Sequence, residues 1–208
     1  MYALPYFVLL GILAGFNSVY LTKSVIFFKN LFASIENEYL KVIAGSLFIS
    51  TLIFFFPALY GEGYSGVRNL IAFTPEFIIP VLLPLVSILL LKPVITSVTL
   101  GVGGDGGVFA PSLFIGAFLG LLVCVSLNHF FYLALIPVNF MLIGMAAVLS
   151  GSIHAPFTAI FLVCAIAGNY VLFVPIVVAC LVANWVAYLL FPYTVYTFKP
   201  VKSAVATV

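Results

Sequence analysis

Long runs of apolar residues, separated by short polar or glycine-rich segments, make up most of this chain. A helix needs about 20 apolar residues to cross the hydrocarbon core of a bilayer. Runs close to that length occupy residues 4–28, 42–59, 77–100, 111–129 and 170–191. Two further runs, residues 139–152 and 155–167, are too short for one crossing. The pattern predicts an all-α integral membrane protein with broken and partially spanning helices.

Polar residues and prolines predict where these helices end or bend. Residues 29–41, KNLFASIENEYLK, form the most polar stretch and are expected to be an exposed loop. The run at residues 77–100 contains Pro80, Pro84 and Pro93. A proline inside a helix removes one hydrogen bond and clashes with the preceding turn. We therefore expect two short or kinked segments there.

The composition supports a membrane location. Hydrophobic residues make up 65% of the 208 residues, charged residues only 6%, and the mean hydropathy is +1.37. Soluble domains carry about 25% charged residues. We expect a multi-pass protein of the cell inner or plasma membrane, with residues 1–208 as a single membrane domain. The first apolar run lacks a preceding basic region, which favours a retained helix over a cleaved signal peptide.

The remaining composition argues against several function classes. The formal net charge of +2 is too small to indicate a nucleic-acid partner. Cys124, Cys164 and Cys180 lie within apolar runs without metal-ligand spacing, so we interpret them as buried structural thiols. No Ser-His-Asp or paired-carboxylate arrangement is evident. We expect neither an enzyme nor a protein-bound cofactor or metal.

The stretch GVGGDGGVFAP, residues 101–111, contains the G-x-G-x-x-G pattern of dinucleotide-binding loops. That fingerprint requires a preceding strand and an acidic residue about 20 positions later. At about that distance this chain has Val125, Ser126 and Leu127, within an apolar run. A nucleotide site is therefore excluded.

The same loop has the chemistry of an anion site. Gly103, Gly104, Gly106 and Gly107 allow backbone N–H groups to turn toward one point, and Gly107 is expected to need a positive φ. Pro111 suits the first turn of the following helix, whose amino end carries partial positive charge. Such an end attracts an anion without any cationic side chain. The alternative is a plain turn whose glycines serve packing only.

Three ionisable residues remain as secondary candidates. Asp105 is expected to help form the turn, and Glu62 to be a solvated acid in the glycine-rich segment YGEGYSGVRN. Lys92 stands beside Pro93 in an apolar run, where an ionisable residue is a functional candidate. It either reaches an interface or raises the local potential for anions, and the sequence does not decide between these.

At this loop the sequence resembles the chloride channel and transporter (CLC) family. The similarity rests on GVFAP at residues 107–111, together with further segments that occur in the family's order. These are GEGYSG at 61–66, PSLFIGAFLG from 111, GMAAVLSGSIHAPFTAIFLV from 144, GNYVL from 168 and VYTF from 195.

The resemblance implies roles for particular residues. The backbone amides of Val108 and Phe109 would help to coordinate a central chloride ion, and the hydroxyl of Tyr196 would be a further donor. Tyr193 is a near neighbour that fits this position less well. Without the resemblance, Tyr196 would be interpreted as an aromatic residue at the membrane interface.

Departures from the family pattern limit what the resemblance implies. A serine loop of the type G-S-G-I-P and a gating-glutamate loop of the type G-R-E-G-P are both absent. The chain therefore resembles the carboxyl-terminal half of a CLC membrane region, its second inverted repeat. His154 replaces a common arginine and is expected to be a packing residue, and Ala165 replaces a common glutamate.

These observations predict half of a pathway for chloride or similar small anions, in a channel or a proton/chloride antiporter. The alternative is a non-conducting membrane subunit, or a truncated fragment, that retains the fold for packing or assembly. The expected partners are the lipid bilayer, a missing amino-terminal half and a second copy in a homodimer. Residues 4–28, 155–167 and 170–191 would form the dimer interface.

Overall fold

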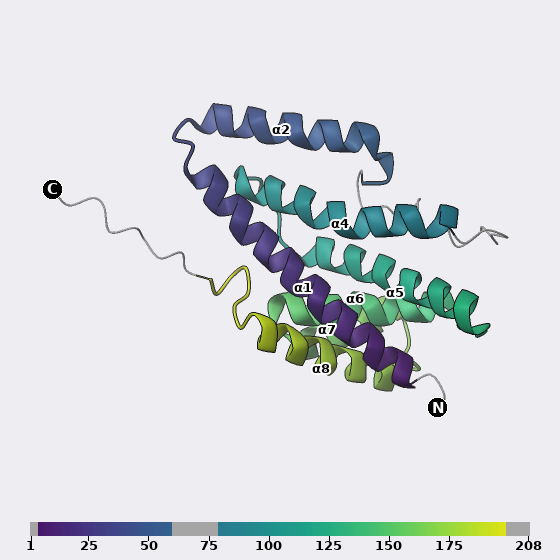
Figure 1. Ribbon diagram of the computed structural model, residues 1–208. Coiled ribbons are helices and arrows are strands. Elements are labelled where there is room, and N and C mark those ends of the chain that lie inside the picture. The colour runs from purple at the N-terminus through teal and green to yellow at the C-terminus, as the bar shows by residue number, and fades with distance from the viewer. Residues whose placement is uncertain (1–3, 60–78, 199–208) are drawn as a thin grey trace.

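The computed structural model describes residues 4–59 and 79–198, and within these ranges all regular structure is helical (Figure 1). The helices are α1 (Leu4–Ala33), α2 (Glu38–Phe55), the 3-10 helix η1 (Pro57–Leu59), α4 (Ile79–Gly101), α5 (Phe109–Phe131), α6 (Pro137–Ile153), α7 (Pro156–Ala167) and α8 (Phe173–Leu190).

The helices differ in length as the apolar pattern predicts. Five have the length and composition to cross a membrane: α1, α2, α5, α8 and the Leu82–Gly101 part of α4. The other two α-helices are shorter, with 17 residues in α6 and 12 in α7. The all-α fold with partially spanning helices is therefore confirmed.

The polar segment at residues 29–41 is mostly helical, so the predicted long loop is wrong. Helix α1 continues to Ala33, and α2 already begins at Glu38. Phe32 is buried and lies beside Gly101, which anchors the end of α1 to the end of α4. Asn37 caps α2, because its side-chain oxygen accepts the Tyr39 N–H at 3.0 Å. Only residues 34–37 connect the helices.

Helix α4 is one continuous helix of 23 residues with Pro84 and Pro93 inside it, so the expected division into two short segments is wrong. Each proline removes an N–H that an interior turn would use, and at Pro93 the carbonyl left without its helical donor is that of Leu89. Helix α1 packs along α4, and its Tyr20 hydroxyl donates to the neighbouring Leu90 carbonyl at 2.9 Å. Membrane helices tolerate proline where neighbouring helices pack against them in this way.

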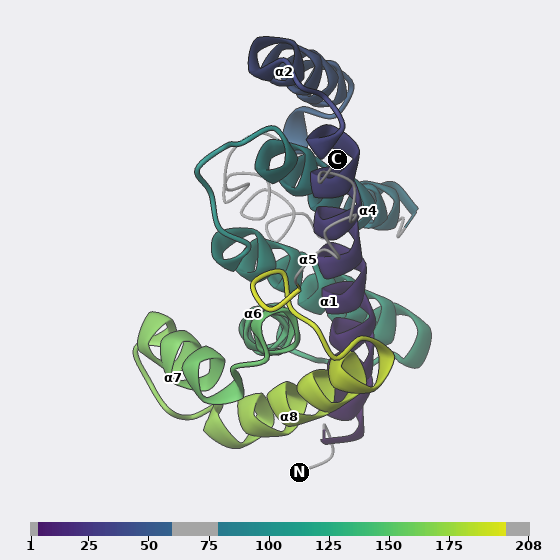
Figure 2. The same ribbon diagram turned by 90° about the vertical axis from the view of Figure 1, so that its left-hand side faces the viewer.

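The centre of the protein is the pair α5 and α6, with α1, α7 and α8 around it (Figure 2). Glycines let α5 and α6 approach to backbone contact. A Cβ at Gly116 would collide with the Gly144 carbonyl, and one at Gly120 with the Phe140 carbonyl. Hydroxyl groups tie further helices to α6. Ser18 of α1 donates to the Val148 carbonyl at 2.9 Å.

The three cysteines are buried and free, as predicted, and they belong to this packed region. Cys180 of α8 accepts a hydrogen bond through its carbonyl from the Ser150 hydroxyl of α6 at 2.9 Å. Burial removes these thiols from solvent, so they contribute as small apolar side chains.

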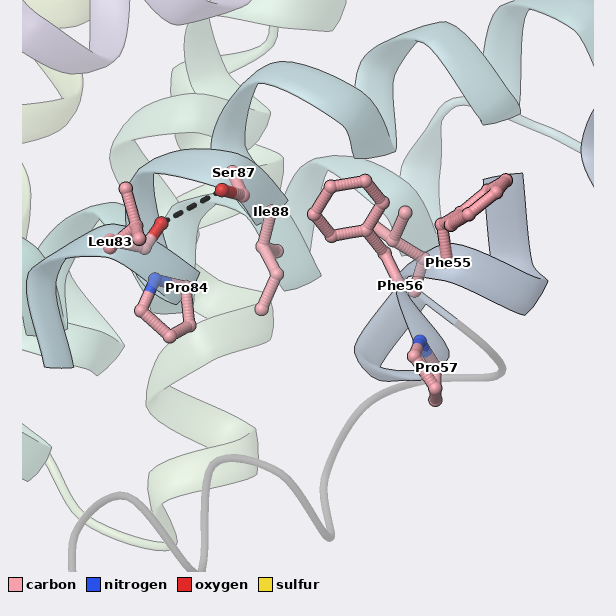
Figure 3. Close-up of a pocket in the computed structure, with 8 residues that line it drawn as sticks. Phe55, Phe56, Pro57, Leu83, Pro84, Ser87 and Ile88 are labelled. Carbon is pink, nitrogen blue, oxygen red and sulfur yellow. Dashed lines mark hydrogen bonds between the residues drawn. The ribbon is translucent and has the colours of Figure 1, made fainter. Parts of the chain in front are cut away.

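Helix α2 lies at one edge of the protein and is exposed over most of its surface, with Gly45 as its only buried residue (Figures 1 and 2). Where α2 and η1 approach the amino end of α4, they leave an apolar cavity of about 230 Å³ (Figure 3). Its lining residues are Phe55, Phe56, Pro57, Leu59, Leu83, Pro84, Ser87 and Ile88.

Candidate anion-binding site

The glycine loop joins α4 to α5, and its first half is a tight turn. Gly103 has φ +98, a conformation that favours glycine. The Gly104 N–H donates to the Thr99 carbonyl at 2.9 Å, and a Cβ on Gly104 would lie 2.8 Å from that oxygen. The exposed Asp105 follows in the loop, consistent with the turn-forming role expected for it.

Gly107 behaves differently from the prediction. The positive φ values among the described glycines belong to Gly103 and Gly168, so the expected positive φ at Gly107 is wrong. The turn of the chain is completed earlier, at Gly103. What Gly107 provides is space: a Cβ there would meet only the Tyr196 hydroxyl at 3.5 Å and the Phe109 nitrogen at 3.8 Å.

The amino end of α5 faces this space. Helix α5 begins at Phe109, with Val108 as its N-cap and Pro111 in the first turn, as predicted. Val108 is buried, with 1% of its surface exposed, and no side chain caps the helix. The first N–H groups of a helix have no partner within it. Since Pro111 has no N–H, the donors left at this end include those of Phe109 and Ala110.

Ser112 orients the first of these donors. Its N–H donates to the Val108 carbonyl at 3.0 Å, and its hydroxyl donates to the same oxygen at 2.6 Å. The Val108 carbonyl and the Phe109 N–H belong to one planar peptide group and point in opposite directions. Because Ser112 holds the carbonyl toward the helix, the Phe109 N–H points away from the helix end.

The structure distinguishes the two candidate tyrosines. The Tyr193 ring packs against Phe191 and Phe198, with ring centroids 5.6 Å and 6.1 Å away. Tyr196 instead places its hydroxyl beside Gly107. The loop and the segment after α8, far apart in sequence, thus bring the Tyr196 hydroxyl and the Phe109 N–H to one space. That these groups bind an anion stays a prediction.

Lys92 makes defined contacts with two other parts of the protein, and the two roles considered for it from the sequence stay predictions. Its ammonium group donates to the Leu59 carbonyl at 2.9 Å and lies 4.7 Å from the centroid of the Phe114 ring. The side chain therefore links the end of η1 to α5. Glu62 and Arg68, with the GEGYSG segment, lie outside the described residues.

His154 forms the corner between α6 and α7. It has φ 53, and its ring packs edge-on against Tyr188 at 5.9 Å. These contacts agree with a packing role. Ala165 lies in the last turn of α7, and its carbonyl accepts the N–H of the C-cap residue Gly168 at 3.2 Å.

The sequence pattern did not predict the hydroxyl groups of Ser112, Thr194 and Thr197, which hydrogen-bond to the backbone next to the proposed donors. Ser112 was part of the resemblance to PSLFIGAFLG, but its bond to Val108 follows only from the helix register. Thr194 and Thr197 bond to one another around Tyr196. The T-x-x-T spacing only partly matches the capping-box pattern, which has Glu or Gln at the fourth position, and so it did not predict this turn.

Known proteins that are similar to this chain identify its family. The family described as "Voltage gated chloride channel" matches residues 1–188. The chain belongs to the voltage-gated chloride channel (CLC) family. It is accordingly a multi-pass integral membrane protein, as the composition predicts.

Individual relatives show how much of the family fold this chain covers. It is 33% identical over 145 residues to the voltage-gated ClC-type chloride channel ClcB of Escherichia coli K12 / DH10B, and equally to that of strain O157:H7. These matches cover 69% of this chain but 34% of ClcB. The chain thus spans about a third of the length of these curated relatives.

Two solved structures share the fold. A slow cyanobacterial Cl−/H+ antiporter superposes with a TM-score of 0.74 at 24% identity, covering 95% of this chain and 46% of the antiporter. A CLC-type fluoride/proton antiporter gives a TM-score of 0.72 at 20% identity, covering 93% of this chain and 45% of that protein. At these identities the likeness concerns the fold alone.

Proposed function

We propose that residues 1–208 form the carboxyl-terminal half of a CLC membrane domain and contribute one side of a pathway for chloride or similar small anions. The supporting observation is the space beside Gly107. The Tyr196 hydroxyl and the Phe109 nitrogen both lie within 4 Å of the point where a Cβ of Gly107 would stand. The task is transport and not catalysis, and the anion itself is the ligand.

The donors suit an ion that must also leave. The amino end of α5 offers the positive end of a helix dipole and neutral N–H groups. A lysine or arginine at this point would hold the anion more strongly, whereas conduction requires binding weak enough for exit. The donors of the proposed site are the backbone amides of Val108 and Phe109 and the Tyr196 hydroxyl, and none of these groups is charged.

The mode of transport, channel or antiporter, also depends on family segments that do not occur in this sequence. ClcB is named a chloride channel, and the two solved relatives are antiporters for chloride and fluoride. The gating-glutamate and serine loops of the family do not occur in this sequence. We propose that an amino-terminal half supplies them, and that the assembly is a homodimer in the inner membrane. Outward side chains on α7 and α8, including Phe157, Phe161 and Trp185, are available for such a contact.

The lack of these two loops also favours a second candidate, a non-conducting subunit that keeps the fold for assembly. The two candidates differ in whether the site binds an anion. A non-conducting subunit predicts no specific chloride binding and no chloride flux, with or without an amino-terminal half.

The experiment measures chloride binding by calorimetry and chloride efflux from liposomes. The chain is purified alone and after co-expression with the amino-terminal half of a CLC relative. Tyr196→Phe is expected to weaken binding about five- to tenfold, the effect of losing one neutral hydrogen bond. Tyr193→Phe is the matched control and leaves binding unchanged, because its ring packs between Phe191 and Phe198. No chloride binding in either preparation would refute the proposal.

A further inference from the structure

The Tyr196 side chain has little to hold it directly. It follows the end of α8 at Leu190 and lies in a short turn, with 65% of its surface exposed. Its ring makes no aromatic contact with the described residues, unlike the ring of Tyr193. A phenol on so exposed a turn would sample many positions, yet its hydroxyl lies beside Gly107. The backbone beneath it must therefore be fixed.

Two threonines fix that backbone by reciprocal hydrogen bonds. The Thr194 hydroxyl oxygen accepts the N–H groups of Tyr196 at 3.3 Å and Thr197 at 3.1 Å. The Thr197 hydroxyl oxygen accepts the Thr194 N–H at 2.8 Å. The Phe198 N–H then donates to the Thr194 carbonyl at 3.0 Å. The reciprocal pattern is that of a capping box, with threonine in place of the usual Glu or Gln, around a single turn.

Residues next to Tyr196 in sequence join the turn to the body of the protein. Thr194 is 4% exposed, and Val195 packs against the core. Phe191 and Phe198, which flank the turn, lie 6.3 Å apart between ring centroids. The Lys23 ammonium of α1 lies 5.5 Å from the Phe191 ring. These contacts hold the two ends of the turn, and the threonine pair sets its internal geometry.

We propose that Thr194 and Thr197 are positioning residues for the Tyr196 hydroxyl, so that the threonine box sets anion affinity without touching the anion. This inference rests on the proposed function, because it assumes that Tyr196 donates to an anion beside Gly107. Each threonine acts through the turn. Without the box, the tyrosine spends less time in its binding position, and apparent affinity falls by the fraction of that time lost.

The first test compares chloride binding by Thr194→Val and by wild type in calorimetry. Both proteins are purified after co-expression with the amino-terminal half of a CLC relative. We expect about two- to fivefold weaker binding, the lower part of the range for a lost N-cap, because the effect cannot exceed that of losing the Tyr196 hydroxyl. Thr194→Ser keeps the oxygen and is expected to restore wild-type affinity. Thr51→Val is the matched control, because Thr51 bonds within the exposed helix α2, to the Leu47 carbonyl at 2.8 Å. It should leave affinity unchanged.

The deciding test is a double-mutant cycle with Tyr196→Phe. If Thr194 acts through the tyrosine hydroxyl, Thr194→Val weakens chloride binding in wild type but has no further effect in the Tyr196→Phe protein. A purely structural role would lower affinity equally in both backgrounds, and that result would overturn the inference.

The outcomes separate this inference from the proposed function. If Tyr196→Phe weakens binding and Thr194→Val does not, the inference is wrong while the proposed site stands. If wild type binds no chloride, the proposed function fails, and the inference fails with it. Thr197→Val provides a second variant should Thr194→Val not fold, with the same expected dependence on Tyr196.

Discussion

Glycines serve opposite purposes in two neighbouring regions, the α5–α6 interface and the loop that precedes α5. In the interface, the backbone of α6 lies where a Cβ of Gly116 or Gly120 would stand, so no larger residue fits at either position. In the loop, Gly106 and Gly107 border open space, and the few atoms near Gly107 are potential donors. Glycines that bring backbones into contact build the fold, whereas glycines that leave room are candidates for binding.

The largest expected effect is in the interface. Gly120→Ala places a methyl group on the Phe140 carbonyl, which cannot move without separating α5 from α6. We expect a loss of about 3 kcal/mol or more in stability, the upper range for overpacking. Thermal unfolding in mild detergent measures it. Gly106→Ala in the loop is the control, since the nearest atom to its added methyl group is a Leu100 methyl carbon at 3.9 Å and little should change. Equal stability of the two variants would contradict the distinction.

Gly107→Val should have the opposite effect to Gly120→Ala, because chloride binding is weakened while the stability of the fold is kept. The branched side chain fills the space between the Tyr196 hydroxyl and the Phe109 nitrogen. We expect chloride affinity to fall about ten- to a hundredfold, as for the loss of one or more aimed donors. Calorimetry measures affinity, and unfolding confirms the fold.

Val108→Ala is the matched control for that experiment. Val108 is buried, so the variant loses stability, but its backbone donors remain and affinity should be largely unchanged. If Gly107→Val folds and binds chloride like wild type, the loop is only a turn.

Gly103→Ala tests the turn itself. At φ +98 an alanine is strained, which costs about 1–2 kcal/mol of stability. Chloride affinity should change less than in Gly107→Val, because the side chain at this position points into open space. A melting temperature equal to wild type would show that the turn readily adopts another conformation.

Gly106→Ala should have the smallest effect. The nearest atom to its added methyl group is a Leu100 methyl carbon at 3.9 Å, and its φ is not positive. We expect stability within about 0.5 kcal/mol of wild type, as for most surface substitutions. A large loss of chloride binding without unfolding would instead extend the site to this glycine.

The sequence by itself predicted the membrane location, the all-α fold, the short helices α6 and α7, and the start of α5 near Pro111. These follow from local properties: the length of apolar runs, the scarcity of charge, and the preference of proline for a first helical turn. The same local reasoning was wrong about a division of α4, where the prolines predicted two short or kinked segments and the helix is continuous. The Tyr20 hydroxyl and the neighbouring helices that support α4 come from distant parts of the chain.

The tertiary structure decided which residues of the candidate site meet. Both Tyr193 and Tyr196 fit the sequence, but only the folded chain directs Tyr193 to the aromatic cluster and Tyr196 to Gly107. It also placed the positive φ at Gly103 and not at Gly107, and it left α8 only 28% buried while α5, with the same hydropathy of 2.2, is 61% buried. Apolar runs specify that a helix enters the membrane. Which face it packs depends on contacts between segments distant in sequence, and small residues permit those contacts only where two backbones meet.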